Sequence, residues 1–170
     1  MNAPALLAWF QDAVPIFGDH ANDILQNQLW VGDINAALDH KWLKTTGITH
    51  ILSVTSFNAA HIALYPQDFT YKAVFAHDNT GEHIIQHWPD TTAFIKSALA
   101  SGGKVLVHCK FGRSRSVATL AAYLVAGLQY TPQAALALIR ERRPQASPNS
   151  FFVFQLYLWG DRQRRLGPPM

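Results

Sequence analysis

The sequence has almost no cysteine and few charged residues. Cys109 is the single cysteine among 170 residues, and 15% of the residues are charged. One thiol excludes both a disulfide framework and a thiolate zinc cluster. No apolar run approaches the roughly 20 residues that span a bilayer, and the 49% of apolar residues exclude a disordered chain. Without an internal repeat or a Gly/Ser-rich linker, the chain is expected to form one domain.

Basic residues are missing from the N-terminal part of the chain. Residues 1–40 contain five Asp and no Lys or Arg, whereas residues 104–170 contain ten Lys or Arg and two acidic residues. This asymmetry fits two interpretations: an anionic ligand bound by the C-terminal half, or a basic solvated surface. The lack of basic residues also argues against a secretory or mitochondrial leader, so we expect a cytoplasmic location.

The order of apolar segments predicts an α/β fold. Short β-branched or apolar segments predict strands at 29–31, 48–54, 69–75 and 105–107. Helical periodicity and capping residues predict helices at about 34–45, 82–100, 116–126, 132–142 and 149–160, the second of them split or kinked at Pro89. Strands separated by helices form a mostly parallel, twisted sheet with helices on its faces. We therefore expect a single α/β domain with its ligand at the carboxyl ends of the strands.

Cys109 directly follows the most apolar of these strands. The segment reads His108-Cys109-Lys110-Phe111-Gly112-Arg113-Ser114-Arg115-Ser116 and runs straight into a helix. The backbone N–H groups of such a loop, together with the helix N-terminus, form a cradle for an anion. Arg115 can fold back to hold two oxygens of the anion, and the same positive field favours the thiolate of Cys109. A thiolate, an oxyanion cradle and an arginine together suit phosphoryl transfer onto sulfur.

This loop resembles the Cys-x5-Arg signature of the cysteine-dependent protein tyrosine phosphatase superfamily. The pattern His108-Cys109-x-x-Gly112-x-Ser114-Arg115-Ser116 is similar to the dual-specificity phosphatase family in particular. The similarity extends over roughly residues 27–160 and includes the segments 29–32, 47–55 and 148–151. It implies a dual-specificity phosphatase-like catalytic domain, which we place at residues 27–165, between an N-terminal extension (1–26) and a C-terminal tail (166–170).

The resemblance also implies the roles of the reacting groups. Cys109 is expected to be the nucleophile and Arg115 the phosphate ligand. Asp78 precedes Cys109 by 31 positions and is expected to act as general acid and then as general base, with Glu82 as its competitor. Ser116 is expected to stabilise the thiolate when the phosphocysteine breaks down, with simple helix capping as the alternative.

The remaining residues of the loop and its surroundings are expected to bind phosphate or to support those that do. The expected phosphate-binding residues are Lys110, Phe111, Gly112, Arg113, Ser114 and Arg115. His108 is expected to tune the thiol. Asn149 is expected to hydrogen-bond the phosphate loop, and capping of the last helix is a compatible alternative.

Two hypotheses about the substrate follow, and one about a role without catalysis. A chain of 170 residues has no room for the loops that build a deep phosphotyrosine slot, so phosphotyrosine and phosphoserine/threonine in proteins are expected. With Lys110 and Arg113, the loop sequence also resembles the loops of the lipid and inositol phosphatases of the superfamily. A phosphoinositide or phosphatidylglycerophosphate substrate therefore stays open, with membrane association only in that case. A non-catalytic phosphoprotein-binding module is the remote alternative, because the chain keeps both Cys109 and Arg115.

No cofactor is expected, because the phosphocysteine route needs none. A metal site is not expected either, since His83 and His87 lack the glutamate of the metalloprotease spacing. Nucleic acid is not an expected partner, because no aromatic stacking platform accompanies the basic runs.

Overall fold

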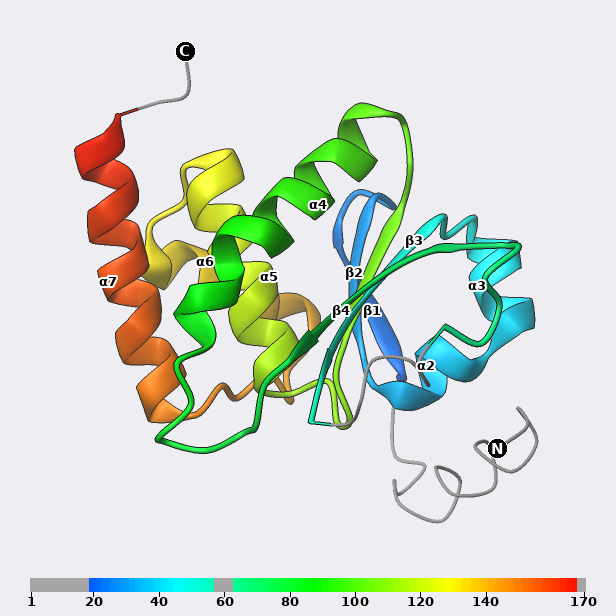
Figure 1. Ribbon diagram of the computed structural model, residues 1–170, viewed down its shortest axis with the longest axis horizontal. Coiled ribbons are helices and arrows are strands. Elements are labelled where there is room, and N and C mark those ends of the chain that lie inside the picture. The colour runs from blue at the N-terminus through cyan, green and yellow to red at the C-terminus, as the bar shows by residue number, and fades with distance from the viewer. Residues whose placement is uncertain (1–18, 57–62, 168–170) are drawn as a thin grey trace.

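The computed structural model describes residues 19–56 and 63–167 and contains one five-stranded sheet (Figure 1). Its strand order is β1-β2-β5-β3-β4. The strands are β1 (Ala21–Leu25), β2 (Leu29–Gly32), β3 (His50–Thr55), β4 (Thr70–Phe75) and β5 (Val105–His108). All neighbouring pairs are parallel except β1 and β2, which are antiparallel. This confirms the predicted mostly parallel α/β sheet.

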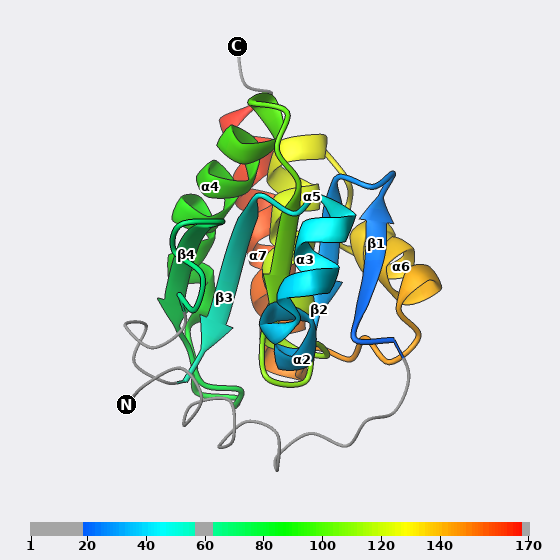
Figure 2. The ribbon, with the colours of Figure 1, turned by 90° about the vertical axis from the view of Figure 1, so that its right-hand side faces the viewer.

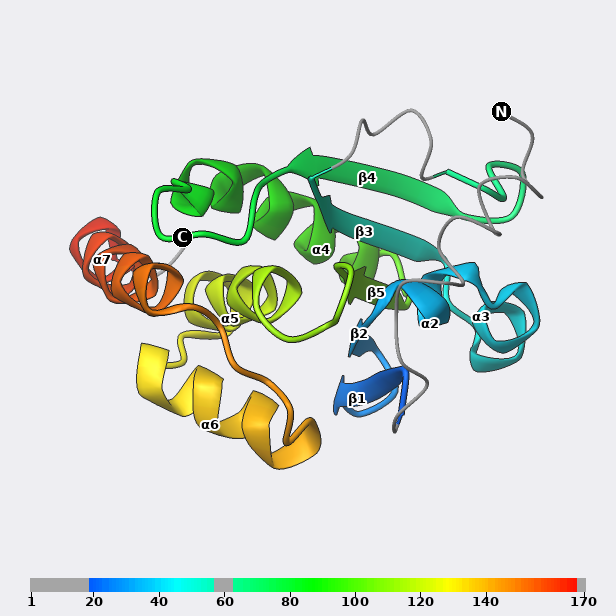
Figure 3. The same ribbon diagram turned by 90° about the horizontal axis from the view of Figure 1, so that it is seen from below.

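Helices cover both faces of the sheet (Figures 2 and 3). One face carries α2 (Ile34–Leu38) and α3 (His40–Thr46). The other carries η2 (Ile84–His87), α4 (Trp88–Ala100), α5 (Arg115–Leu128), α6 (Pro132–Arg142) and α7 (Ser150–Leu166). The α5 helix packs against the other three long helices and against the strands, and eleven of its fourteen residues are buried.

The central strand β5 shows why the sequence folds in this way. All four of its residues are buried, because β2 and β3 flank it and helices cover both faces. A strand buried on both faces needs the unalternating apolar sequence found here. It delivers the segment that follows it to the carboxyl edge of the sheet, where loops bind ligands in this class of fold.

The helix starts were predicted more accurately than the helix ends. Asp33 caps α2 as expected, but Asp39 interrupts the predicted helix 34–45 and caps α3. The helix predicted over 82–100 is split, and Pro89 lies in the first turn of α4. The α5 helix passes through Gly127, where a Cβ would lie 2.7 Å from the ring of Tyr123, and α7 likewise continues beyond residue 160.

Residues 21–25, which were expected in an N-terminal extension, form the edge strand β1. The sequence Ala-Asn-Asp-Ile-Leu lacks the alternation of a half-buried strand, so the pattern gave no signal. Residues 1–18 of the expected extension and 168–170 of the expected tail lie outside the described residues. In the described part, no helix is both long and apolar enough to cross a membrane.

Candidate active site

Cys109 lies between the end of β5 and the start of α5, as predicted. The residue is 3% exposed, and its Sγ atom is 3.2 Å from the Oγ atom of Ser116. Ser114, not Ser116, occupies the N-cap position of α5. The alternative that Ser116 only caps the helix is therefore wrong, and its hydroxyl is placed against the sulfur.

The loop of residues 109–114 directs the carbonyl groups of Lys110, Gly112 and Arg113 toward neighbouring segments. Four of its carbonyl oxygens accept hydrogen bonds from outside the loop. Ser114 O accepts from Ala118 N in α5 (2.8 Å), and three accept from more distant segments: Lys110 O from Ile34 N (3.2 Å), Gly112 O from Arg143 Nε (2.7 Å) and Arg113 O from Ser147 N (2.8 Å). In a trans peptide the N–H group points opposite to the carbonyl. The N–H groups that follow these carbonyls are therefore directed to the inner side of the loop, where an anion can accept from them.

Arg115 begins α5 and is buried, with 6% of its surface exposed. Its Nη1 atom donates to the carbonyl oxygen of Ala76 over 3.2 Å, which ties it to the segment after β4. Its Nε atom is buried and has no hydrogen-bond partner among the described residues. A buried guanidinium group with an unpaired donor is costly, and an oxyanion would relieve that cost.

Asp78 is held against the loop by two donors. Its Oδ1 atom accepts from Ser114 Oγ over 2.7 Å and from Asn149 Nδ2 over 2.8 Å. The backbone N–H of Asn149 also donates to Ser114 Oγ over 3.0 Å, while its Oδ1 accepts from Phe152 N and caps α7. Asn149 thus contacts the loop through its backbone N–H, while its side chain bonds Asp78 and caps α7. The side chain of Glu82 accepts from the backbone N–H of His77 over 2.9 Å.

His108 is buried at the end of β5, and its Nε2 atom is 2.7 Å from the hydroxyl of Ser53 on β3. Burial lowers the pKa of His108 to about 4. The imidazole is therefore neutral at pH 7 and adds no charge next to the nucleophile.

The side chains of Lys110, Phe111 and Arg113 form the outer rim of the loop. Phe111 is 45% exposed, and Lys110 Nζ lies 5.2 Å from the centre of its ring. Arg113 Nε donates to the carbonyl oxygen of Gln145 over 3.3 Å. At Phe111 the structure thus leaves the backbone, not the side chain, to contact an anion inside the loop.

Gln155 was not predicted to matter, yet it holds the segment that carries Asp78. It is buried on α7, accepts from Ile85 N over 3.0 Å and donates to Glu82 O over 2.9 Å. The sequence did contain a signal for this role, because Gln155 is the one amide side chain in the aromatic run 151–159. That run was expected to face the core, and Phe152 and Trp159 do, whereas Phe154 is 55% exposed.

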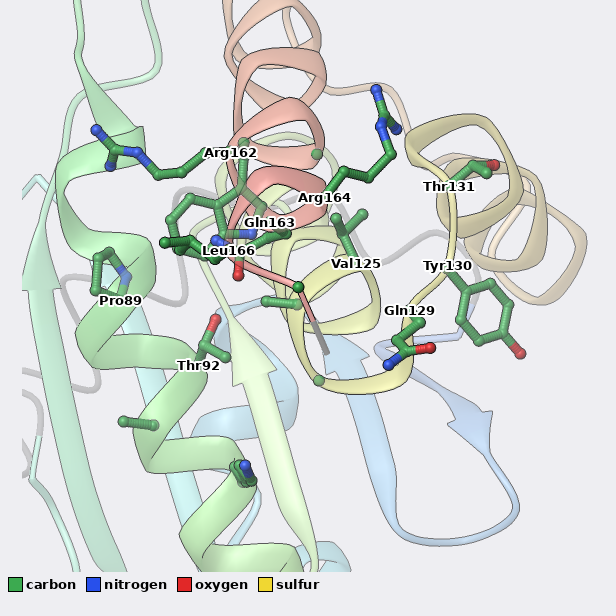
Figure 4. A pocket seen from close by; sticks show the side chains of 17 residues that line it. Pro89, Thr92, Val125, Gln129, Tyr130, Thr131, Arg162, Gln163, Arg164 and Leu166 are labelled. Atoms are coloured by element: carbon green, nitrogen blue, oxygen red, sulfur yellow. The ribbon is translucent and has the colours of Figure 1, made fainter. Parts of the chain in front are cut away.

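A separate cavity of about 1040 Å³ opens between α4, the end of α5 and the C-terminal turns of α7 (Figure 4). Thr92, Val125, Gln129 and Arg162 are among its lining residues, and no predicted site residue is. Across residues 19–56 and 63–167, no three His, Cys, Asp or Glu side chains gather as a metal site would require.

Comparisons with known proteins place the chain in one family. The family model described as dual specificity phosphatase, catalytic domain, matches residues 29–162. Dual specificity protein phosphatase 1 of Arabidopsis thaliana is 37% identical over 139 residues, which cover 81% of this chain and 68% of that protein. Dual specificity protein phosphatase 22-B of Danio rerio is 38% identical over 139 residues, covering 82% of this chain and 73% of that protein.

A solved structure is similar over almost its whole length. The human tyrosine phosphatase-like serine/threonine/tyrosine-interacting protein aligns with a TM-score of 0.78 and 35% sequence identity. The alignment covers 84% of this chain and 96% of that one. Together with the matched family model, this confirms the family that the loop sequence predicted.

Proposed function

The chain belongs to the dual specificity phosphatase family and is a cysteine-dependent phosphatase, and from that premise we propose that it hydrolyses phosphotyrosine and phosphoserine/threonine in proteins through a phosphocysteine on Cys109. One observation carries the assignment of the site. The loop that holds the buried thiol leads directly into α5 at Arg115, and the buried guanidinium of Arg115 has an Nε atom with no partner among the described residues.

In the first step, the Cys109 thiolate attacks the phosphorus atom of the bound ester. The S–P bond forms while the P–O bond to the leaving group breaks. Arg115 and the inward N–H groups of the loop hold the three non-bridging oxygens, and this stabilises the charge that builds up on them. Asp78 donates its proton to the departing oxygen, which leaves as an alcohol or phenol.

In the second step, water attacks the phosphorus of the phosphocysteine. Asp78, now a carboxylate, takes a proton from that water, and the S–P bond breaks to release inorganic phosphate. The electron pair returns to sulfur, and the Ser116 hydroxyl at 3.2 Å donates a hydrogen bond to the new thiolate. No other nucleophile or cofactor enters this sequence of bonds.

Two supporting groups fix the general acid. Ser114 and Asn149 both donate to Oδ1 of Asp78, so Oδ2 is the oxygen left to carry the transferred proton.

His108 supports the nucleophile without charge, because burial lowers its pKa to about 4. Lys110 and Arg113 add positive charge at the rim, where they attract anionic substrates.

The experiment that tests this function compares wild-type protein with Cys109→Ser, in EDTA, on a panel of phosphoesters. The panel holds phosphotyrosine and phosphothreonine peptides, a phosphoinositide and phosphatidylglycerophosphate. We expect the highest kcat/KM on the peptides, no turnover by Cys109→Ser, and retained peptide binding by that variant. Undiminished turnover by Cys109→Ser would overturn the covalent route. A higher kcat/KM on either lipid would overturn the proposed substrate class, and binding without turnover by the wild type would indicate a binding module.

A further inference from the structure

Arg143, which directly follows α6, is a buried arginine that the mechanism above does not use. It is 1% exposed. In the described part of the chain no carboxylate lies within ion-pair distance of it. Burial lowers the pKa of Arg143, and the nearby charges of Asp33, Cys109 and Asp19 act in the opposite direction. A guanidinium group stays protonated at neutral pH, so a buried cation lies close to the phosphate loop.

The hydrogen bonds of Arg143 join the phosphate loop to the N-terminal edge of the sheet. Its Nε atom donates to the carbonyl oxygen of Gly112 over 2.7 Å. Its Nη1 atom donates to the carbonyl oxygen of Asp19 over 3.1 Å and to Oδ1 of Asn22, on β1, over 2.6 Å. These acceptors hold the planar group in one orientation, because their positions match the fixed directions of its N–H bonds.

Gly112 leaves the space that this contact requires. Its φ of 61° is in the left-handed region, and a Cβ there would lie 2.6 Å from Arg143 Nη2. The same Cβ would lie 2.6 Å from the carbonyl group of Gly32 at the end of β2. A side chain at position 112 would therefore clash with both the guanidinium group and the end of strand β2.

We propose that Arg143 is a positioning residue for phosphate binding: it holds the Gly112 carbonyl outward and so directs the Arg113 N–H toward the bound phosphoryl group. Ile34 and Ser147 do the same for the carbonyls of Lys110 and Arg113, but only with neutral backbone donors. A charged donor makes the stronger hydrogen bond, and its charge also favours an anion in the loop. This inference rests on the proposed phosphate loop but does not depend on turnover.

The test measures the binding of tungstate, a phosphate mimic, to the full chain by calorimetry. Arg143→Met should raise the Kd of tungstate at least about tenfold. This is the change in an equilibrium constant that the loss of one charged hydrogen bond produces. Arg142→Met is the matched control. Arg142 is the exposed neighbour of Arg143, and its replacement removes the same charge without changing a contact to the loop. The Kd of this variant for tungstate should stay within about twofold of wild type. Thermal unfolding of each variant separates lost stability from lost affinity.

Arg143→Lys covers the case in which Arg143→Met does not fold. Lysine keeps a buried cation but cannot reproduce the planar set of three contacts, so the Kd should still rise. The inference is overturned if folded Arg143→Met, or Arg143→Lys, binds tungstate within about twofold of wild type. Wild-type protein that binds tungstate but hydrolyses no ester would refute the proposed function, while a raised Kd in the variants would still support the role of Arg143.

Discussion

The burial of His108 next to the nucleophile predicts that acid unfolds this protein in a particular pH range. The pKa of His108 is lowered from its ordinary 6.5 to about 4, mainly by burial; Asp33 attracts the imidazolium and Arg115 repels it. Between these pH values the unfolded chain binds a proton that the folded chain does not. The stabilisation is therefore complete above pH 6.5 and is lost as the pH falls toward 4. Its full size is roughly 3 kcal/mol, of which about 2 kcal/mol is lost between pH 7 and pH 5.

Urea unfolding at pH 7 and pH 5 measures this loss. The wild type should lose about 2 kcal/mol more than His108→Gln over this interval, because glutamine does not titrate. His83→Gln replaces an exposed histidine and should show the pH dependence of the wild type. The NMR signals of the wild-type imidazole should report a neutral ring at pH 5. Equal pH dependence in wild type and His108→Gln, or a protonated His108 in the folded protein at pH 5, would refute the reasoning.

The remaining predictions concern the reacting groups. Asp78→Asn keeps the acceptor for Ser114 but carries no acidic proton, so kcat should fall about a hundredfold on phenyl phosphate and far less on p-nitrophenyl phosphate; equal losses would exclude Asp78 as the acid. Ser116→Ala should release the first aryl alcohol in a rapid-quench burst, because breakdown of the phosphocysteine becomes limiting. Asn149→Asp keeps the helix cap but removes the donor to Asp78; it should lower kcat at a nearly unchanged Tm, whereas Asn149→Ala should also cost about 1 kcal/mol of stability. Peroxide should inactivate the protein through Cys109, and thiols should restore little activity after long exposure, since no second cysteine can form a protective disulfide.

Several parts of the fold were predictable because their signals are local. The unbroken apolar run of β5 reflects burial on both faces of the sheet, and Pro89 marks the point where the helix is interrupted. The segment from Cys109 to Ser116 contains the nucleophile, the loop and the arginine in one stretch of sequence. Its chemistry could therefore be inferred without knowing what surrounds it.

Other parts depend on contacts between distant positions. Arg143 bonds Gly112 from 31 positions away and Asp19 from 124, and Gln155 reaches Ile85 over 70. No spacing rule connects such pairs, because a hydrogen bond across the fold leaves no periodic trace in either segment. The strand β1 was missed for a related reason. It is an edge strand with one neighbour, and its burial is too partial to impose an apolar pattern.

Helix α7 both packs into the core and positions the general acid. Phe152 and Leu156 fill the interior, while Asn149 and Gln155, one turn or less away along the chain, hold the proton donor and the residues that follow it. If the first two turns of α7 fray while the rest of the domain stays folded, these contacts are lost. Asp78 is then no longer held in place to protonate the leaving group. If the start of α7 unfolds first, heat inactivation is expected to precede global unfolding.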